Sequence, residues 1–300
     1  MEEQDVKSGP RLYLAIIGLA ISMAVSGLCR AQADGSHQDG PASNFAPLEV
    51  WKNCVLTGDT AGLKMLYSIN PPAEIKSPAG KNNADSDVDF WMGLKGRSIK
   101  LDVGETHSPQ DGVLVILFQA EVSSAAQPKQ ATVYVKVGQV WQKQQDTWRL
   151  ATVERTDALH LKQVFKKDKD LYPGSADARA EIKEAEAKAA KEHKRVLLVF
   201  GANWCYDCHV LDLAFHRPEF GPVMAGYEVV HVDIGPDGKK NANLAKQFQV
   251  PLDKGVPALA VLESDGKLIV SQKNGEFENA RASTPEALLE FLNKWKPKQL

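Results

Sequence analysis

The sequence predicts two consecutive folded domains, an α+β domain followed by an α/β domain that carries a Cys-x-x-Cys motif. A chain of 300 residues is longer than a typical single domain, and its 43% hydrophobic and 25% charged residues are ordinary for globular proteins. Helix-forming segments followed by β-rich segments fill the middle of the chain, whereas strands and helices alternate after residue 176. Cys205 and Cys208 stand where the first of those later strands meets a helix.

The middle region opens with segments that favour helices and continues with segments that favour strands. The expected helices are 47–56, 60–67 and a third near 88–94. The expected strands are 98–106, 113–123, 131–143 and 147–156. Val133, Val135 and Val137 share one parity in the third of these strands, as a sheet with one covered face requires. Helices followed by an antiparallel meander predict an α+β layer.

Several short phrases in this region resemble a known group of proteins. They are Val50-Trp51-x4-Leu56-x-Gly58-Asp59, Gly138-Gln139-Val140-Trp141 and Trp148-Arg149-Leu150. Together they resemble the cone-shaped SnoaL-like group of the nuclear transport factor two superfamily. The resemblance implies an α+β cone over residues 45–165 and a small apolar ligand within it. No acid or histidine can be assigned a catalytic place here, because His107 and His160 fit surface or capping positions.

After residue 176 the pattern alternates between strands and helices. The expected strands are 195–200, 227–234, 258–262 and 268–272, the second parallel to the first and the last two joined by a turn. The expected helices are 176–193, one beginning near Cys205, 241–248, and a closing helix whose Ser283 and Glu286 have capping-box spacing. These elements predict an α/β domain over residues 176–300.

Cys205 and Cys208 are placed to make and break a disulfide. At a strand-to-helix turn the first sulfur lies by the helix N-terminus, where unpaired backbone N–H groups and the helix dipole favour the thiolate. The thiolate attacks a disulfide, and the second sulfur is close enough to attack the resulting mixed disulfide and release the reduced partner. The motif therefore predicts a two-electron thiol–disulfide reaction that needs neither a cofactor nor a metal.

Other interpretations of the motif remain open. With His209 the string becomes Cys-x-x-Cys-His, which is the pattern for covalent haem attachment. The two cysteines could also take part in a zinc or copper site, but a closed tetrahedral zinc site takes four ligands and the sequence has no second close Cys pair. The pair could equally form a structural disulfide or remain two unreactive thiols.

The order β-α-β-α-β-β-α, with Trp204-Cys205-x-x-Cys208 after the first core strand and Val256-Pro257 before the third, resembles the thioredoxin family. The sequence of residues 201–205 looks closest to those of the subgroup related to the C-terminal domain of bacterial membrane disulfide reductases. The resemblance implies that Cys205 attacks and Cys208 resolves. It also implies a cis peptide at Val256-Pro257 that faces the disulfide, and substrate binding by Trp204 and the Val256 backbone. A trans proline that merely starts a strand is the alternative.

Three residues around the motif bear on its mechanism. Many thioredoxins carry a buried carboxylate six residues before the first cysteine, and this sequence has Val199 there. A carboxylate at Asp207 opposes ionisation of Cys205, whereas His209 offsets this effect when it is protonated. Asp207 could instead be a solvated acid in the first helical turn, without influence on the sulfur.

The N-terminus predicts export. Residues 12–28 form an uncharged apolar run that follows Lys7 and Arg11 and precedes the small-x-small pattern Ala31-Gln32-Ala33. Residues 1–33 are therefore predicted to be a bacterial-type signal peptide, or an uncleaved membrane anchor, and 34–44 a flexible leader. The protein is expected to be periplasmic or secreted, with membrane attachment only if the segment is not cleaved. A lipoprotein reading of Cys29 is disfavoured by the Leu28 that precedes it.

The net charge and the position of Cys54 limit the functions that the sequence can have. With 36 basic and 38 acidic residues the formal net charge is −2, so no basic field is expected to recruit nucleic acid. Cys54 lies at the edge of an apolar helical face and fits a buried thiol.

A charged and Pro/Gly-containing stretch, 166–175, is predicted to link the domains.

The sequence thus predicts an exported thiol–disulfide oxidoreductase that reduces protein disulfides. Its partners would be disulfide-containing proteins and an upstream thiol electron donor. A ligand-binding or adaptor protein with a thioredoxin-fold scaffold is the alternative, which an intact Cys pair disfavours.

Overall fold

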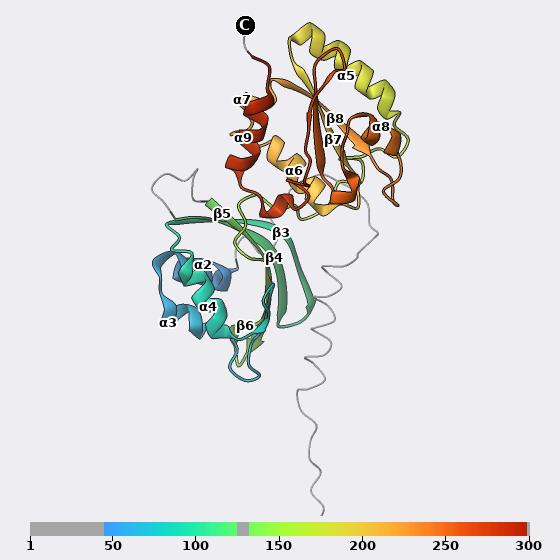
Figure 1. Cartoon of the computed structure of the whole chain (residues 1–300). Coiled ribbons are helices and arrows are strands. Elements are labelled where there is room, and N and C mark those ends of the chain that lie inside the picture. The colour runs from blue at the N-terminus through green and yellow to red at the C-terminus, as the bar shows by residue number, and fades with distance from the viewer. Residues whose placement is uncertain (1–44, 125–131, 299–300) are drawn as a thin grey trace, which may run out of the picture.

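The computed structural model describes residues 45–124 and 132–298, which form two domains in contact (Figure 1). The expected signal peptide, 1–33, and leader, 34–44, lie outside the described residues. Within the described part of the chain, no helix combines the length and the apolar character needed to cross a membrane.

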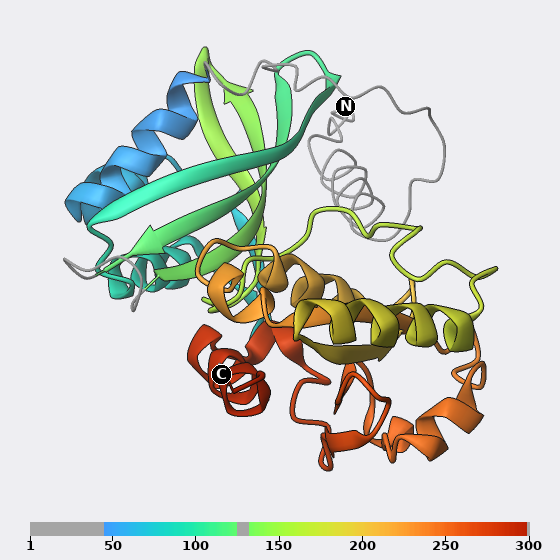
Figure 2. The ribbon, with the colours of Figure 1, turned by 90° about the horizontal axis from the view of Figure 1, so that it is seen from above.

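The middle domain is a curved six-stranded sheet that wraps around helices on one face (Figure 2). Its strand order is β2-β1-β6-β5-β4-β3. The strands are β1 (Glu74–Ser77), β2 (Gly80–Asn82), β3 (Ser98–Gln110), β4 (Val113–Ser123), β5 (Thr132–Gln144) and β6 (Thr147–Arg155). The helices are α2 (Ala46–Thr57), α3 (Thr60–Met65) and α4 (Ala84–Gly93). The expected α+β architecture and antiparallel meander are confirmed.

Three details of this domain differ from the prediction. The hairpin β1–β2 was not predicted, because its strands are short and largely polar and β1 pairs with the distant β6. Helix α4 begins at Ala84 rather than near 88, since the side chain of Asn83 accepts a hydrogen bond from the backbone N–H of Ser86 (3.0 Å) and caps the helix. Helix α3 ends before Tyr67, which instead forms a bridge to Leu150 in β6.

Aromatic side chains fill the space between the helices and the sheet. Trp51 from α2 and Trp91 from α4 meet edge to face with ring centroids 4.8 Å apart, and Trp51 packs on Phe118 of β4 in the same way at 5.5 Å. These rings and Trp141 are at most 1% exposed. These tryptophans are therefore core residues, whereas the apolar ligand stays a prediction.

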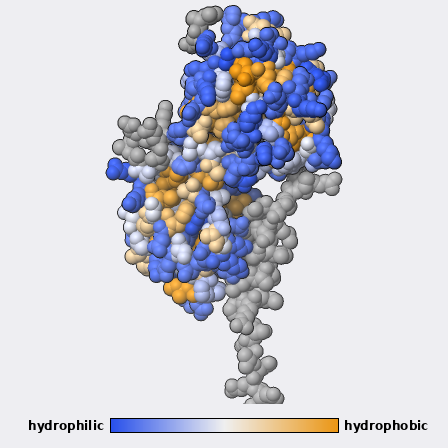
Figure 3. All heavy atoms as spheres, viewed as in Figure 1, coloured by the Kyte–Doolittle hydropathy of each residue, from blue (hydrophilic) through white to orange (hydrophobic). Residues whose placement is uncertain are grey.

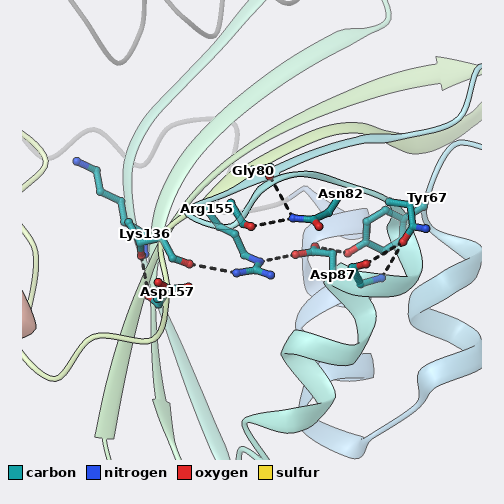
Figure 4. A network of polar contacts seen from close by, with 11 residues as sticks. Tyr67, Gly80, Asn82, Asp87, Lys136, Arg155 and Asp157 are labelled. Carbon is teal, nitrogen blue, oxygen red and sulfur yellow. Dashed lines mark hydrogen bonds and ion pairs between the residues drawn. The ribbon is translucent and has the colours of Figure 1, made fainter.

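A buried polar network fastens α4 to the sheet (Figure 4). Asp87 is fully buried and accepts hydrogen bonds from the Tyr67 hydroxyl and from Nε of Arg155, both at 2.6 Å. The guanidinium of Arg155 also lies 3.4 Å from the centre of the Phe90 ring. Burial, followed by the charge of Asp87, raises the pKa of Tyr67. The network therefore holds a charge pair inside the cone, where loss of either partner leaves the other unpaired.

The C-terminal domain is a four-stranded sheet of order β10-β9-β7-β8 with helices on both faces. The strands are β7 (Arg195–Gly201), β8 (Tyr227–Asp233), β9 (Ala258–Leu262) and β10 (Leu268–Ser271). The helices are α5 (Ala178–Glu192), α6 (Tyr206–Phe215), α7 (Gly221–Met224), α8 (Ala242–Gln247) and α9 (Pro285–Trp295). β7 runs parallel to β8 and antiparallel to β9, and the predicted element order is confirmed.

Side chains along β7 point alternately to the two faces of the sheet, so the hydrophobic core of this domain has two parts. Val196, Leu198 and Phe200 pack with α5 and α8 on one face, whereas Leu197 and Val199 pack with α6, α7 and α9 on the other. Figure 1 shows these two helical layers on either side of the sheet. The cap of α9 differs by one residue from the prediction, because Thr284, rather than Ser283, accepts a hydrogen bond from the backbone N–H of Ala287 (3.2 Å).

The stretch from Leu161 to Tyr172, called here the connecting segment, packs against both domains. Gln119 of β4 exchanges two hydrogen bonds with the backbone of Gln163, which fixes the segment to the outer face of the cone sheet. Leu161 is fully buried in the C-terminal core, and Tyr172 is 1% exposed. Leu171 and Tyr172 of the predicted linker 166–175 thus pack on the C-terminal domain. On the face drawn in Figure 3, hydrophilic residues surround scattered hydrophobic groups.

Candidate active site

The two cysteines lie where β7 ends and α6 begins. A tight turn leaves β7 after Gly201, and the backbone N–H of Cys205 donates to the carbonyl of Ala202 (2.9 Å). Cys205 is the N-cap residue of α6, so its sulfur takes the place that a capping oxygen usually takes. The sulfur accepts a hydrogen bond from the backbone N–H of Cys208 (3.1 Å). Its position at the helix N-terminus, predicted from the sequence, favours a thiolate there.

The sulfurs of Cys205 and Cys208 are joined in a disulfide that is almost enclosed. Cys205 is 5% exposed and Cys208 is completely buried. The first sulfur is thus the one that an incoming molecule can reach. This difference in exposure fits attack by Cys205 and resolution by Cys208.

The peptide bond Val256-Pro257 is cis, as the resemblance implied, and it faces the disulfide. The carbonyl oxygen of Val256 lies 3.5 Å from the sulfur of Cys205. Binding of a substrate backbone by Val256 stays a prediction. The partial negative charge of this carbonyl disfavours a thiolate at Cys205 and favours a thiol that donates to it.

Trp204 is the largest exposed apolar group beside the disulfide. Half of its surface is exposed, and its Nε1 donates to the carbonyl of Gly235 (2.9 Å), which fixes the ring orientation. Lys167 of the connecting segment donates to the Trp204 carbonyl (2.9 Å). A fixed, exposed indole next to a reactive sulfur is suited to contact a protein substrate, and substrate binding by Trp204 stays a prediction.

Tyr172 packs directly against both cysteines, and the sequence analysis did not identify it. Asn203, in the turn before Cys205, holds it there: Asn203 Oδ1 accepts from the Tyr172 N–H (2.8 Å), and Asn203 Nδ2 donates to the Tyr172 carbonyl (2.9 Å). Burial, followed by the charges of Asp212 and Asp233, raises the pKa of Tyr172 well above its ordinary value. Tyr172 lies in a charged stretch with no apolar periodicity, so no sequence pattern marks it as a site residue.

Comparison with known proteins agrees with this geometry. A family model described as Thioredoxin-like matches residues 177–264. The C-terminal domain is therefore a thioredoxin-like domain. Over 89 residues, or 29% of this chain, it is 28% identical to the thiol:disulfide interchange protein DsbD 2 of Pseudomonas aeruginosa. The chain spans 15% of the length of that relative.

Two solved structures cover one domain each. The disulphide isomerase of Xylella fastidiosa Temecula1 is 38% identical, covers 41% of this chain and 95% of its own, and has a TM-score of 0.39. An NTF-2 like protein of unknown function from Shewanella oneidensis MR-1 is 13% identical, covers 39% of this chain and 100% of its own, and has a TM-score of 0.33. The curved sheet wrapped around helices in the middle domain is the α+β cone that the sequence resemblance implied.

Asp207 has a partner in the thioredoxin-like domain that the sequence did not reveal. Its carboxylate accepts hydrogen bonds from the backbone N–H (2.9 Å) and Nε (3.0 Å) of Arg281, and it also pairs with Nη2 of that side chain. Asp207 is 8% exposed. The interpretation of Asp207 as a solvated first-turn acid is therefore wrong. Its effect on Cys205 stays a prediction, and Arg281 now enters the charge balance with it.

His209 and Val199 occupy structural positions near the site. His209 is 3% exposed, and its Nε2 lies 3.1 Å from the carbonyl oxygen of Asn203, so it braces the turn that precedes Cys205. Its proposed influence on the thiolate stays a prediction. Val199 is 1% exposed within the α6 side of the core. An apolar side chain there can neither accept nor donate the proton of the resolving thiol.

Cys54 lies apart from this site, in the core of the cone. It is buried on α2, as predicted. Burial, followed by the charge of Asp59, raises the pKa of the Cys54 thiol. A thiol that ionises less readily is a weaker nucleophile at neutral pH, so Cys205 and Cys208 remain the predicted redox pair.

Proposed function

We propose that this chain is an exported thiol–disulfide oxidoreductase that reduces disulfides in other proteins. The observation that carries the proposal is the placement of Cys205 as the N-cap of α6. There its sulfur accepts a hydrogen bond from the backbone N–H of Cys208 and faces the Val256-Pro257 peptide. Cys205 is also the more exposed of the two cysteines. This placement supports attack by Cys205, resolution by Cys208 and binding of an extended chain by the Val256 backbone. The thioredoxin-like domain supports the class of reaction.

The reaction is balanced within the site. The Cys205 thiolate attacks one sulfur of a substrate disulfide, so a mixed disulfide forms and one substrate thiolate leaves. The Cys208 thiolate then attacks the Cys205 sulfur, closes the Cys205–Cys208 disulfide, and releases the second substrate thiolate. The substrate gains two electrons and the protein loses two. A dithiol donor upstream must therefore reduce the pair again before the next cycle.

The reductant direction rests on the surroundings of Cys205. A strongly oxidising pair needs a specially stabilised thiolate, because this stabilises the reduced form. Here the Cys205 sulfur receives one backbone N–H but also faces the Val256 carbonyl oxygen at 3.5 Å. The carbonyl offsets the stabilisation that the helix N-terminus gives. We therefore propose a pair that donates electrons to its substrates.

Export belongs to the proposal as well, with membrane attachment only if the N-terminal segment is not cleaved. Export rests on the apolar run 12–28 and on the cleavage pattern that follows it. The relative in Pseudomonas aeruginosa is called a thiol:disulfide interchange protein, which supports disulfide-containing partners for this chain. A small apolar ligand of the cone remains part of the proposal.

The assignment of the two sulfurs can be tested by trapping. In Cys208→Ser the attacking sulfur remains while its release route is gone, so mixed disulfides with a reducible protein such as insulin should accumulate. Cys205→Ser should trap none. Non-reducing electrophoresis and mass spectrometry identify the adduct and the cysteine that carries it.

Cys54→Ser serves as the matched control for loss of a cysteine and should leave insulin reduction unchanged. Adducts on Cys208 in the Cys205→Ser variant would reverse the assignment. A wild-type protein that neither reduces insulin nor forms adducts would refute the proposed function.

A further inference from the structure

We infer that Tyr172 donates a hydrogen bond to the sulfur of Cys208 when the pair is reduced, and so favours the thiolate that resolves the mixed disulfide. The inference deepens the proposed function, because it assigns a further residue to the same site. The tyrosine reaches the site from the connecting segment, outside the region 177–264 that the family model matches.

Gly201 shows how close the hydroxyl and the sulfur are. A Cβ added at Gly201 would lie less than 3.0 Å from three atoms, namely Oη and Cζ of Tyr172 and Sγ of Cys208. The hydroxyl end of the tyrosine and the sulfur therefore flank the same point at the end of β7. Glycine leaves this point empty, so no side chain separates them.

The hydroxyl of Tyr172 has no hydrogen-bond partner among the described residues, although it is completely buried. Burying a hydroxyl without a partner costs about 1–3 kcal/mol. The neighbouring His231 ring meets the Tyr172 ring edge on, with centroids 5.2 Å apart, and its Nε2 lies 3.1 Å from Asp212 Oδ1. The Tyr172 hydroxyl makes no hydrogen bond to this ring.

Reduction supplies the missing acceptor. A sulfur in a disulfide is a weak acceptor, whereas a thiolate is a strong one, and a hydrogen bond to a charged group contributes more than one between neutral groups. The raised pKa of Tyr172 keeps its proton on oxygen at neutral pH, so the group acts as a donor rather than as a base. Val199 supplies no polar group to this sulfur, and the tyrosine provides one from another element.

The proposed step is balanced as follows. The proton of the Cys208 thiol goes to solvent, and the resulting thiolate accepts the Tyr172 O–H. The thiolate then forms a bond to the Cys205 sulfur while the bond from Cys205 to the substrate breaks, and the substrate thiolate carries away the electron pair. The tyrosine keeps its proton throughout.

Titration of Cys208 tests the inference directly. In a Cys205→Ser background no disulfide can form within the motif, and NMR of ¹³Cβ-labelled cysteine follows each cysteine separately. Tyr172→Phe removes only the hydroxyl. We expect it to raise the midpoint pH at which Cys208 ionises by about one unit, a tenfold change in the ionisation constant. With Cys205 restored, mixed disulfides of Tyr172→Phe with insulin should resolve about threefold more slowly at neutral pH, because the greater nucleophilicity of the more basic thiolate offsets part of the tenfold loss of thiolate.

Tyr227→Phe is the matched control, because it also removes a buried hydroxyl, one bonded to the Leu292 carbonyl at 2.7 Å in the same domain. It should leave the Cys208 midpoint unchanged. An unchanged or lower midpoint in Tyr172→Phe, with an unchanged near-ultraviolet circular dichroism spectrum, would overturn the inference. The titration needs no substrate, so its outcome is independent of whether the wild-type protein reduces insulin.

Discussion

The ion pair between Asp207 and Arg281 sets the charge near Cys205. The sequence placed a lone carboxylate next to Cys205, whereas the structure balances it with a guanidinium that also lies 4.8 Å from the Tyr206 ring centre. Removal of either partner therefore leaves a single charge of known sign near the N-terminus of α6. The pair makes the electrostatic contribution testable in both directions.

Asp207→Asn should raise the reduction potential, because Arg281 then stands uncompensated and stabilises the Cys205 thiolate. Arg281→Gln should lower it, because the carboxylate then stands alone. Each shift should stay within about 30 mV, equivalent to roughly 1.4 kcal/mol for this two-electron couple, since the Arg281 side chain is 44% exposed and solvent screens it. Equilibration with glutathione measures both potentials. Shifts of the same sign in the two variants would contradict the electrostatic account.

The local part of the site could be predicted from spacing, because Trp204, Cys205 and Cys208 stand in one short motif. The position of Val256-Pro257 opposite Cys205, 51 residues along the chain, was implied by the resemblance to the thioredoxin family. Arg281 is 74 residues from its partner Asp207, and Tyr172 lies in a stretch that resembles an ordinary charged linker. Contacts over such separations depend on the packing of whole elements, which spacing does not encode.

The connecting segment is an element of the fold rather than a tether. Lys136 of β5 donates to the Val164 carbonyl (3.0 Å) and so does the Tyr206 hydroxyl (3.0 Å), so one carbonyl joins the cone sheet to helix α6. The sequence predicted a linker here from charged residues and from Pro173-Gly174. Strands could be recognised from the alternation of apolar and polar residues. A segment without regular structure has no such pattern, even when single residues such as Leu161 are fully buried.

Fragments of the C-terminal part test this role. A fragment 173–298 lacks Leu161 and Tyr172, whereas a fragment 158–298 keeps both. Complete burial of a leucine side chain contributes about 1.5–3 kcal/mol. We expect the shorter fragment to be at least that much less stable in urea unfolding, and Leu161→Ala in the longer fragment to reproduce about 2–5 kcal/mol of loss. Equal stability of the two fragments would show that the segment packs without contributing to the core.

Among the described residues, the large hydrophobic clusters lie inside the cone and on the two faces of the C-terminal sheet. The fold class of each domain could be predicted, because the order of helices and strands and their alternation were visible in the sequence. The buried pair of Asp87 and Arg155 could not, because an acid in the first turn of a helix usually faces solvent. The position of this pair within the cone allows one core to be perturbed without touching the other.

Asp87→Ala should destabilise the cone by about 3–5 kcal/mol, because it leaves the 6%-exposed Arg155 side chain and the Tyr67 hydroxyl without a partner. The matched control is Asp85→Ala in the same turn of α4, where an exposed pair with Lys64 contributes less than about 1 kcal/mol. Differential scanning calorimetry should show a lower-temperature transition in Asp87→Ala alone. The reduction potential of the Cys205–Cys208 pair should not change in either variant, since Asp87 faces the interior of the cone. A potential that moves with Asp87→Ala would instead show that the cone is coupled to the active site through the connecting segment.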